Sequence, residues 1–329
     1  MSEKDTTFDR LQERLWSFAE HRVITVAGKT GILAELANGP VAIESMAQKL
    51  GLAAMPTGKI VRALTALGLA EPAGDEYALV SGLKEIFAPG PRDFTPFLEH
   101  SHFMYDRWGQ SLEPWLRGEK WGTQKRDPAG IRRFDDAMKA MGGQIARRAA
   151  DLMDLTRVEK MLDVGGGTGT YAIEFAKRAP NLKAVVLDMP EVAEHGRELG
   201  EGTDMSDRVE FTGGDYMDPQ CYGEGHDLVL LANVLHQETV ERASTMVRLG
   251  AGALSPGGML AVIDFSIDEE RRENILGTLF AINMRSFGDT YPESVIHGWF
   301  SDAGLGDHGR IDIDPHRWIL YANKPNEPA

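Results

Sequence analysis

The sequence predicts an α/β protein in which a doubly wound parallel sheet follows a smaller, mainly helical N-terminal region. From residue 158 onward, apolar segments of strand length alternate with segments of helix length. A glycine-rich turn at 165–169 joins the first of these strands to a helix, where a ligand can lie against bare backbone. Within the first 90 residues, two short helices followed by a hairpin form the pattern of a winged helix.

The N-terminal helices are predicted from apolar residues at helical spacing. Such residues cover 8–37, where Gly28 and Gly31 are expected to interrupt the helix, and 41–52, which ends at a glycine. A second short helix over about 55–67 and a hairpin over 69–79 complete the winged-helix pattern. The next segment, 91–157, is mostly helical and rich in aromatic residues, with a long helix from about 130 to 155.

The C-terminal half is predicted to hold the sheet. Candidate strands are 160–164, 183–187, 208–212, 227–232 and 259–265, and the tail at 317–322 reads as a last strand. Candidate helices lie near 169–179, 190–200 and 239–254.

Composition excludes several classes of protein. The 329 residues are 42% apolar and 26% charged, as in an ordinary globular protein with room for two domains. The single cysteine, Cys221, excludes an internal disulfide, and we expect a cytoplasmic protein without a signal peptide or a membrane span. The net charge of −15 is concentrated in 158–329, which has 14 basic and 29 acidic residues, so we expect no nucleic-acid partner.

The glycine turn and three acids indicate which ligand the sheet binds. Gly165 and Gly167 are followed by Thr170 where a dinucleotide fingerprint would have its third glycine. Asp163 precedes the turn, Asp188 ends the second strand and can accept from both ribose hydroxyls, and Asp215 follows the third strand, where an acid can accept from an adenine amino group while Tyr216 covers the ring. Two such acids suit one adenosine, and hence S-adenosylmethionine (SAM); the alternative is ordinary turn acids and helix caps.

These segments resemble the small-molecule O-methyltransferases of the caffeate, acetylserotonin and hydroxyneurosporene type. The resemblance covers nearly the whole chain and implies a Rossmann-like SAM methyltransferase domain over 158–329, a winged-helix-like dimerisation domain over 1–90 and a helical connector over 91–157 that contributes to the acceptor pocket. It therefore implies a homodimer with SAM and a small-molecule acceptor as its ligands. It is carried by Leu162–Gly169, Leu187–Val192, Gly213–Asp215, Asn233–His236, Leu254–Gly258 and Phe134–Met138, and Asn233 is expected beside SAM with the acids.

His236 is the expected general base. It follows the fourth strand, and the resemblance implies that it takes the proton of the acceptor hydroxyl while Asp264 orients the imidazole. The chain departs from the family here, because His236 continues as Gln237-Glu238 and not as Asp-Trp. A second acid expected beside the histidine falls near Thr290, with Asp289 adjacent.

The acceptor pocket is expected to draw on two segments. Phe134, Met138 and Met141 share one side of the long helix, where they either line the pocket or pack as core. His100 and His102 likewise either line the acceptor pocket or pack against other residues. The segment before Gly288 borders the acceptor, where Arg285 either holds an acidic group or forms a surface ion pair. The candidate pocket residues are Phe134, Met138, Met141, Asn283, Met284 and Arg285.

Three alternatives remain open at this point. The first is S- or C-methylation of a small acid, because an already nucleophilic acceptor needs no strong base; a metal held by His236, His297 and a carboxylate is a minor variant, and we expect no metal. The second is a SAM-binding protein without activity. The third is a DNA-binding regulator. Against it, the second short helix has only two cations, Lys59 and Arg62, and a surface that binds DNA phosphates generally needs more.

Overall fold

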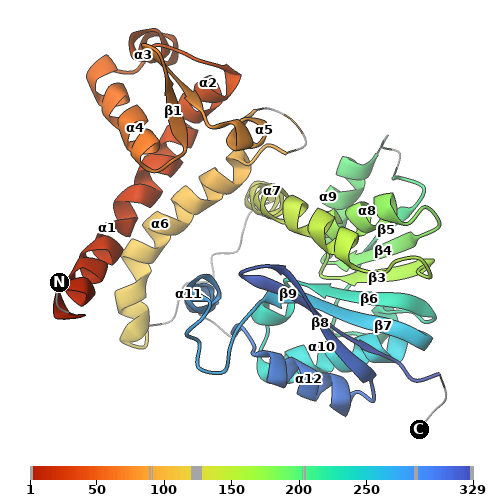
Figure 1. The fold of residues 1–329 in the computed structure, drawn as a ribbon. Coiled ribbons are helices and arrows are strands. Elements are labelled where there is room, and N and C mark those ends of the chain that lie inside the picture. Colours follow the sequence, from red (N-terminus) through yellow and green to blue (C-terminus); the bar gives the residue numbers. More distant parts are fainter. Residues whose placement is uncertain are drawn as a thin grey trace. The chain divides into compact units, whose positions relative to one another are not determined.

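The computed structural model describes residues 3–88, 90, 92–119, 128–201, 203, 205–284 and 288–326. The chain forms two compact units, shown with their elements in Figure 1. The first comprises Met1–Arg117 and Asp136–Met141, and the second comprises Gly118–Asp135 and Gly142–Ala329.

The first unit has the helices and hairpin that the sequence predicts. A long α1 (Glu3–Lys29) precedes α2 (Ile32–Asn38), α3 (Ile43–Leu50) and α4 (Ala54–Ala66). The strands β1 (Ala70–Ala73) and β2 (Glu76–Leu79) pair antiparallel. The helices α5 (Lys84–Phe87), after a short turn at Ser81–Leu83, and α6 (Thr95–Leu116) follow. Leu33, Leu36, Met46, Leu64 and Leu79 form a fully buried core, which holds the helices against the hairpin.

One glycine of α1 does not act as expected. The helix continues through Gly28 and is interrupted only at Gly31, whose φ of +83° is left-handed. A Cβ at Gly28 would lie 2.5 Å from Cδ1 of Leu98 on α6, so the lack of a side chain lets the two helices approach closely. Gly28 is therefore a site of close helix packing and not a helix breaker.

The second unit is a seven-stranded sheet in the order β5-β4-β3-β6-β7-β9-β8. The first five strands of this unit are parallel, and they confirm the predicted doubly wound sheet. They are β3 (Lys160–Val164), β4 (Lys183–Asp188), β5 (Val209–Gly213), β6 (His226–Ala232) and β7 (Leu254–Phe265). Chain order reverses between β3 and β6, which opens a crevice at the carboxyl ends of the strands.

The sheet ends in an antiparallel pair. The predicted last strand, β9 (Arg317–Asn323), runs antiparallel to β7, and β8 (Gly306–Asp314) pairs with its other side. The strand β8 was not predicted, because most of its residues are polar. This composition suits an exposed edge strand.

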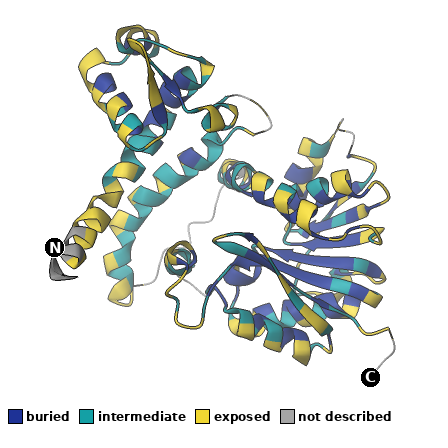
Figure 2. Cartoon of the chain, viewed as in Figure 1, coloured by how far each residue is buried: buried dark blue, intermediate teal, exposed yellow. Residues whose placement is uncertain are grey.

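Helices cover both faces of this sheet (Figure 1). The end of α7 (Pro128–Leu152), α8 (Thr170–Arg178) and α9 (Pro190–Gly200) pack on one face. On the other face lie α10 (Val240–Ala253) and α12 (Glu293–Asp302), while α11 (Ile275–Asn283) lies between β7 and α12 in the chain. Figure 2 shows the central strands β3 and β6 mostly buried. None of the described helices is long and apolar enough to cross a membrane.

Candidate functional site

The glycine turn lies at the crevice between β3 and β6. Gly165, Gly167 and Gly169 all have left-handed φ angles, of +69°, +60° and +74°. A Cβ at Gly165 would lie 2.6 Å from Cγ2 of Val234, so the turn packs tightly against the loop after β6. A Cβ at Gly167 would meet no atom within 4 Å. Gly167 therefore presents bare backbone to open space, as a ligand-binding turn requires.

Asp188 is attached to this turn. Its carboxylate accepts the backbone N–H of Gly167 at 2.8 Å and that of Met189 at 2.7 Å. Burial raises the pKa of Asp188 above its ordinary value. Each carboxylate oxygen has two lone pairs, so both oxygens keep the capacity to accept a hydroxyl hydrogen. This geometry suits the ribose-binding role expected of Asp188.

Asp163 lies beneath the turn. It is fully buried, and a Cβ on Gly166 would lie 2.6 Å from its carboxyl group. Among the described residues, neither carboxylate oxygen has a hydrogen-bond partner. Burial, with the charge of Asp188 adding to it, raises the pKa of Asp163 to about 7. A fully buried acid with a raised pKa is characteristic of a functional site, where a cationic ligand can offset its charge.

Asp215 and Tyr216 follow β5, as expected. Asp215 is exposed, and one of its oxygens accepts the backbone N–H of Met217 at 2.8 Å. Tyr216 is half-buried, and its hydroxyl donates to Oε1 of Glu238 at 2.6 Å. Sequence reasoning named Tyr216 but missed Glu238, because 22 residues separate the two partners.

Asn233 lies at the carboxyl end of β6 and has a φ of +54°, unusual for a residue other than glycine. Its side-chain amide donates to the hydroxyl of Tyr171 on α8 at 3.0 Å. The asparagine therefore links the β6 end to the helix that follows the glycine turn. Contact of Asn233 with SAM stays a prediction.

His236 lies on the short turn Leu235–Gln237 after β6 and is buried. Its Nδ1 is 2.8 Å from Oδ1 and 3.0 Å from Oδ2 of Asp264 near the end of β7. Because a carboxylate only accepts, Nδ1 carries the proton and Nε2 keeps a lone pair. Nε2 makes no hydrogen bond to a described residue. The pair predicted from sequence is thus brought together in the tautomer that a general base needs.

Two phenylalanines surround the imidazole. The rings of Phe280 on α11 and His236 meet edge-to-face with centroids 5.0 Å apart, and the Phe280 ring centroid lies 4.6 Å from that of Phe265. Sequence reasoning missed Phe280, because its helix is apolar nearly throughout and shows no face that marks a site.

Neither residue at the expected second-acid position hydrogen-bonds the imidazole of His236 in the described structure. Asp289 is ion-paired with Arg271 at 2.7 Å. Thr290 is fully buried; its hydroxyl accepts from Arg271 at 3.0 Å and donates to the Gly277 carbonyl at 3.3 Å. Arg271 therefore holds both residues, and among the described residues Asp264 alone hydrogen-bonds the imidazole.

The candidate acceptor residues lie on two elements. Phe134, Met138 and Met141 share α7, where Met138 and Met141 belong to the first unit. Asn283 ends α11 and Met284 follows it, whereas Arg285 lies outside the described residues. Pocket lining by these side chains stays a prediction.

His297, His100 and His102 contact residues other than the candidate site residues. His297 on α12 has Nδ1 3.9 Å from a Glu293 oxygen, and its ring lies 5.1 Å from that of His308. No group of three potential metal ligands occurs within the described part of the chain. His102 hydrogen-bonds Arg22 at 3.0 Å, and the ring of His100 lies 6.3 Å from Phe97.

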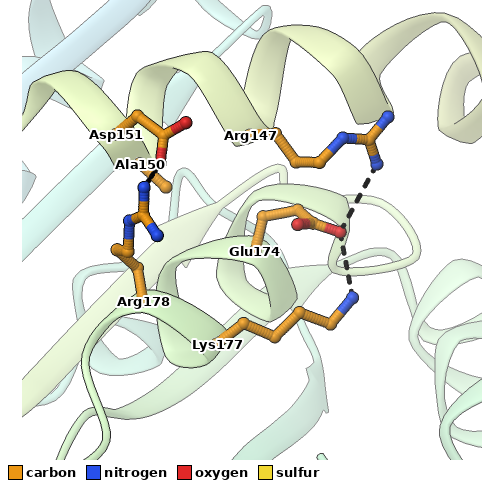
Figure 3. Close-up of a pocket in the computed structure, with 6 residues that line it drawn as sticks. All are labelled: Arg147, Ala150, Asp151, Glu174, Lys177 and Arg178. Carbon is orange, nitrogen blue, oxygen red and sulfur yellow. Dashed lines mark hydrogen bonds and ion pairs between the residues drawn. The ribbon is translucent and has the colours of Figure 1, made fainter.

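Two surface hollows lie apart from these residues. One, of about 230 Å³, lies between α7 and α8; there Arg147 and Lys177 approach Glu174 while Arg178 pairs with Asp151 (Figure 3). The second hollow, of about 390 Å³, has four carboxylates and Arg310 among its lining residues. None of the candidate site residues lines either hollow.

The structure of human N-acetylserotonin methyltransferase in complex with SAM superposes with a TM-score of 0.84, covering 99% of each chain at 24% identity. The chain therefore has the fold of that methyltransferase, a Rossmann-like sheet with an N-terminal helical domain.

The family follows from the sequence comparison. A family model described as an O-methyltransferase domain matches residues 102–305, more than half of the chain. The chain is 26% identical over 324 residues to the tetracenomycin polyketide synthesis 8-O-methyltransferase TcmO of Streptomyces glaucescens, covering 94% of each protein. It is 27% identical over 315 residues to the 3-hydroxy-5-methyl-1-naphthoate 3-O-methyltransferase of Streptomyces sahachiroi, covering 92% of this chain and 90% of that protein. The chain belongs to the O-methyltransferase domain family, whose members here use SAM to methylate small-molecule acceptors.

Proposed function

We propose that this chain transfers the methyl group of SAM to a hydroxyl of a small aromatic acceptor, with His236 as the general base. The single observation that supports this role is the Asp264–His236 pair, which leaves Nε2 of a buried imidazole with its lone pair and no described partner. SAM supplies an activated methyl group, so the chain has to orient the acceptor, exclude water and remove one proton.

The cofactor is proposed to lie across the glycine turn. Asp188, held by the Gly167 amide, accepts from the ribose; Asp215 accepts from the adenine amino group; and Tyr216 covers the adenine ring. The unpartnered carboxylate of Asp163 contributes negative charge beneath the turn, which favours a ligand that carries a sulfonium and an ammonium. These features fit SAM.

An aromatic acceptor is supported by the surroundings of His236. The rings of Phe280 and Phe265 make the side of the His236 imidazole that they contact apolar and aromatic. Planar rings pack well against such surfaces by edge-to-face or offset contact. The naphthoate named for one relative is an acceptor of this kind.

To test this proposal, the purified protein is incubated with SAM and one acceptor at a time: a hydroxynaphthoate, its methoxy analogue, a thiol or a 2-oxo acid. We expect S-adenosylhomocysteine to appear with the hydroxynaphthoate and not with the methoxy analogue, and mass spectrometry to place the added methyl on oxygen. Methylation of the thiol or the 2-oxo acid alone would replace this proposal with S- or C-methylation. SAM binding without turnover on any acceptor in a broad metabolite extract would indicate a protein without activity.

We also propose that the first unit forms a homodimer through α1. Leu11, Leu15, Trp16 and Phe18 on this helix are between 52% and 66% exposed, and Figure 2 shows this half of α1 as exposed. A cluster of large apolar side chains in water is expected to be covered by a partner, and a second copy offers the same apolar surface.

Light scattering tests the dimer. We expect the protein to be a dimer at micromolar concentration and Leu15→Glu to be monomeric, while the control Met55→Glu on α4, whose side chain is equally exposed, stays dimeric. A monomeric parent protein would contradict the proposal. A cytoplasmic location also remains a proposal, supported by the single cysteine and open to test by cell fractionation.

A further inference from the structure

Glu238 lies two residues after His236, where the loop after β6 leads into α10, and it is only 8% exposed. We infer that Glu238 is a positioning residue that holds Tyr216 in place for the adenosine half of SAM. This inference rests on the proposed function, because it takes Tyr216 to be part of the cofactor site.

Both oxygens of the Glu238 carboxylate are engaged. Oε1 accepts the hydroxyl of Tyr216 at 2.6 Å, and Oε2 accepts from Nε of Arg242, one turn into α10. The Glu238 backbone is also held, because its carbonyl accepts the hydroxyl of Tyr291 at 2.5 Å. A buried carboxylate with two side-chain partners and an anchored backbone cannot easily rotate.

Tyr216 is therefore fixed at both ends. Its carbonyl accepts the hydroxyl of Tyr222 at 2.8 Å, and its own hydroxyl is held by Glu238. Burial and the hydrogen bond to Glu238 raise the pKa of Tyr216, so the phenol stays protonated and remains a donor at working pH. Fixing the ring before the ligand arrives lowers the entropy that binding must remove.

The Glu238–Tyr216 contact joins the loop after β5 to the loop that carries His236. The first loop holds the proposed adenine-binding residues and the second holds the proposed base. Because Asp264 orients the imidazole independently, breaking the Tyr216 contact should weaken SAM binding without displacing His236. A residue with a purely structural role would instead lower thermal stability and leave SAM affinity unchanged.

The experiment compares Tyr216→Phe, Glu238→Ala, their double variant and Glu238→Gln by calorimetric titration with SAM and by thermal unfolding. We expect Tyr216→Phe and Glu238→Ala each to raise the Kd for SAM about tenfold, or ~1.4 kcal/mol, because a hydrogen bond to a charged group is lost. Glu238→Gln should stay within about threefold of the parent, because its amide oxygen still accepts from the phenol. The double variant should bind no more weakly than the weaker single variant.

The controls separate this inference from the proposed function. Glu241→Ala removes an exposed acid three residues away on α10 and should leave the Kd unchanged. Unchanged SAM affinity in Tyr216→Phe, or effects that add in the double variant, would overturn the role of Glu238. If Glu238→Ala fails to fold, Tyr216→Phe and Glu238→Gln still decide the question. Failure of the parent protein to bind SAM would contradict the proposed function itself.

Discussion

His236 and Asp264 meet through a hydrogen bond of 2.8 Å between Nδ1 and Oδ1, and the same Oδ1 accepts the backbone N–H of Phe265 at 2.8 Å. The backbone contact anchors the carboxylate at the end of β7, and the carboxylate in turn anchors the imidazole after β6. These two strands are parallel neighbours, so the pair is held by the sheet and not by loop conformation alone.

We expect His236→Gln to lower kcat by about 10²–10⁴-fold, the usual contribution of a general base, while the Kd for SAM changes little. The matched control is His226→Gln. His226 is also buried but begins β6, at the opposite end of the strand, and its Nε2 bonds the Tyr222 carbonyl at 2.8 Å. The control should lose stability and keep turnover. Full turnover in His236→Gln would exclude the proposed base.

Asp264→Asn should also impair turnover, because an amide no longer selects the tautomer in which Nε2 is unprotonated. We expect kcat to fall about 10²-fold or more with SAM affinity retained. Steady-state kinetics and calorimetry measure the two quantities. Equal losses in SAM affinity and in turnover would indicate a structural role for Asp264.

Gly167→Ala should abolish tight SAM binding. A side chain at a φ of +60° costs about 1–2 kcal/mol in backbone strain, and its Cβ enters the space proposed for the ligand. Gly74→Ala in the β1–β2 turn is the matched control, because Gly74 has a φ of +69° and equally open surroundings. The two variants should lose similar stability, measured by urea unfolding, while only Gly167→Ala loses affinity for SAM. Equal SAM affinity in both would place the ligand elsewhere.

Asp163→Asn should stabilise the SAM-free protein at neutral and alkaline pH. The pKa of Asp163 is about 7 in the folded protein, above the ~3.9 of an unfolded chain, so over this interval the folded state binds more protons than the unfolded state. The free energy of unfolding of the parent therefore falls as pH rises from about 4 to 7 and then levels off.

The asparagine variant lacks this loss. Its advantage over the parent should grow between pH 5.5 and pH 8, to a size on the order of a few kcal/mol. Chemical unfolding at both pH values measures it, with the exposed Asp302→Asn as the control. Parallel pH profiles for the parent and Asp163→Asn would show that burial does not raise this pKa.

Local sequence predicted most of the second unit. The segments that became β3, β6 and most of β7 are largely apolar and buried from both sides, and the helices between the parallel strands carry clear apolar faces. The edge strand β8 and the helix α11 were not predicted. The residues of β8 are mostly polar and those of α11 are nearly all apolar, so neither segment shows the alternation of apolar and polar residues that marks a strand or a helix. The proposed division at residues 90 and 157 remains a prediction.

The sequence by itself determined the fold class, the glycine turn and the acids that follow successive strands, because each depends on a local pattern or on order along the chain. Only the tertiary structure decided which side chains are partners. In the structure Tyr216 hydrogen-bonds Glu238 and Phe280 packs against His236. Asp289 forms an ion pair with Arg271 rather than with the histidine. Contacts between residues far apart in the chain depend on how strands are ordered and loops packed, and neither leaves a periodic signal in the sequence.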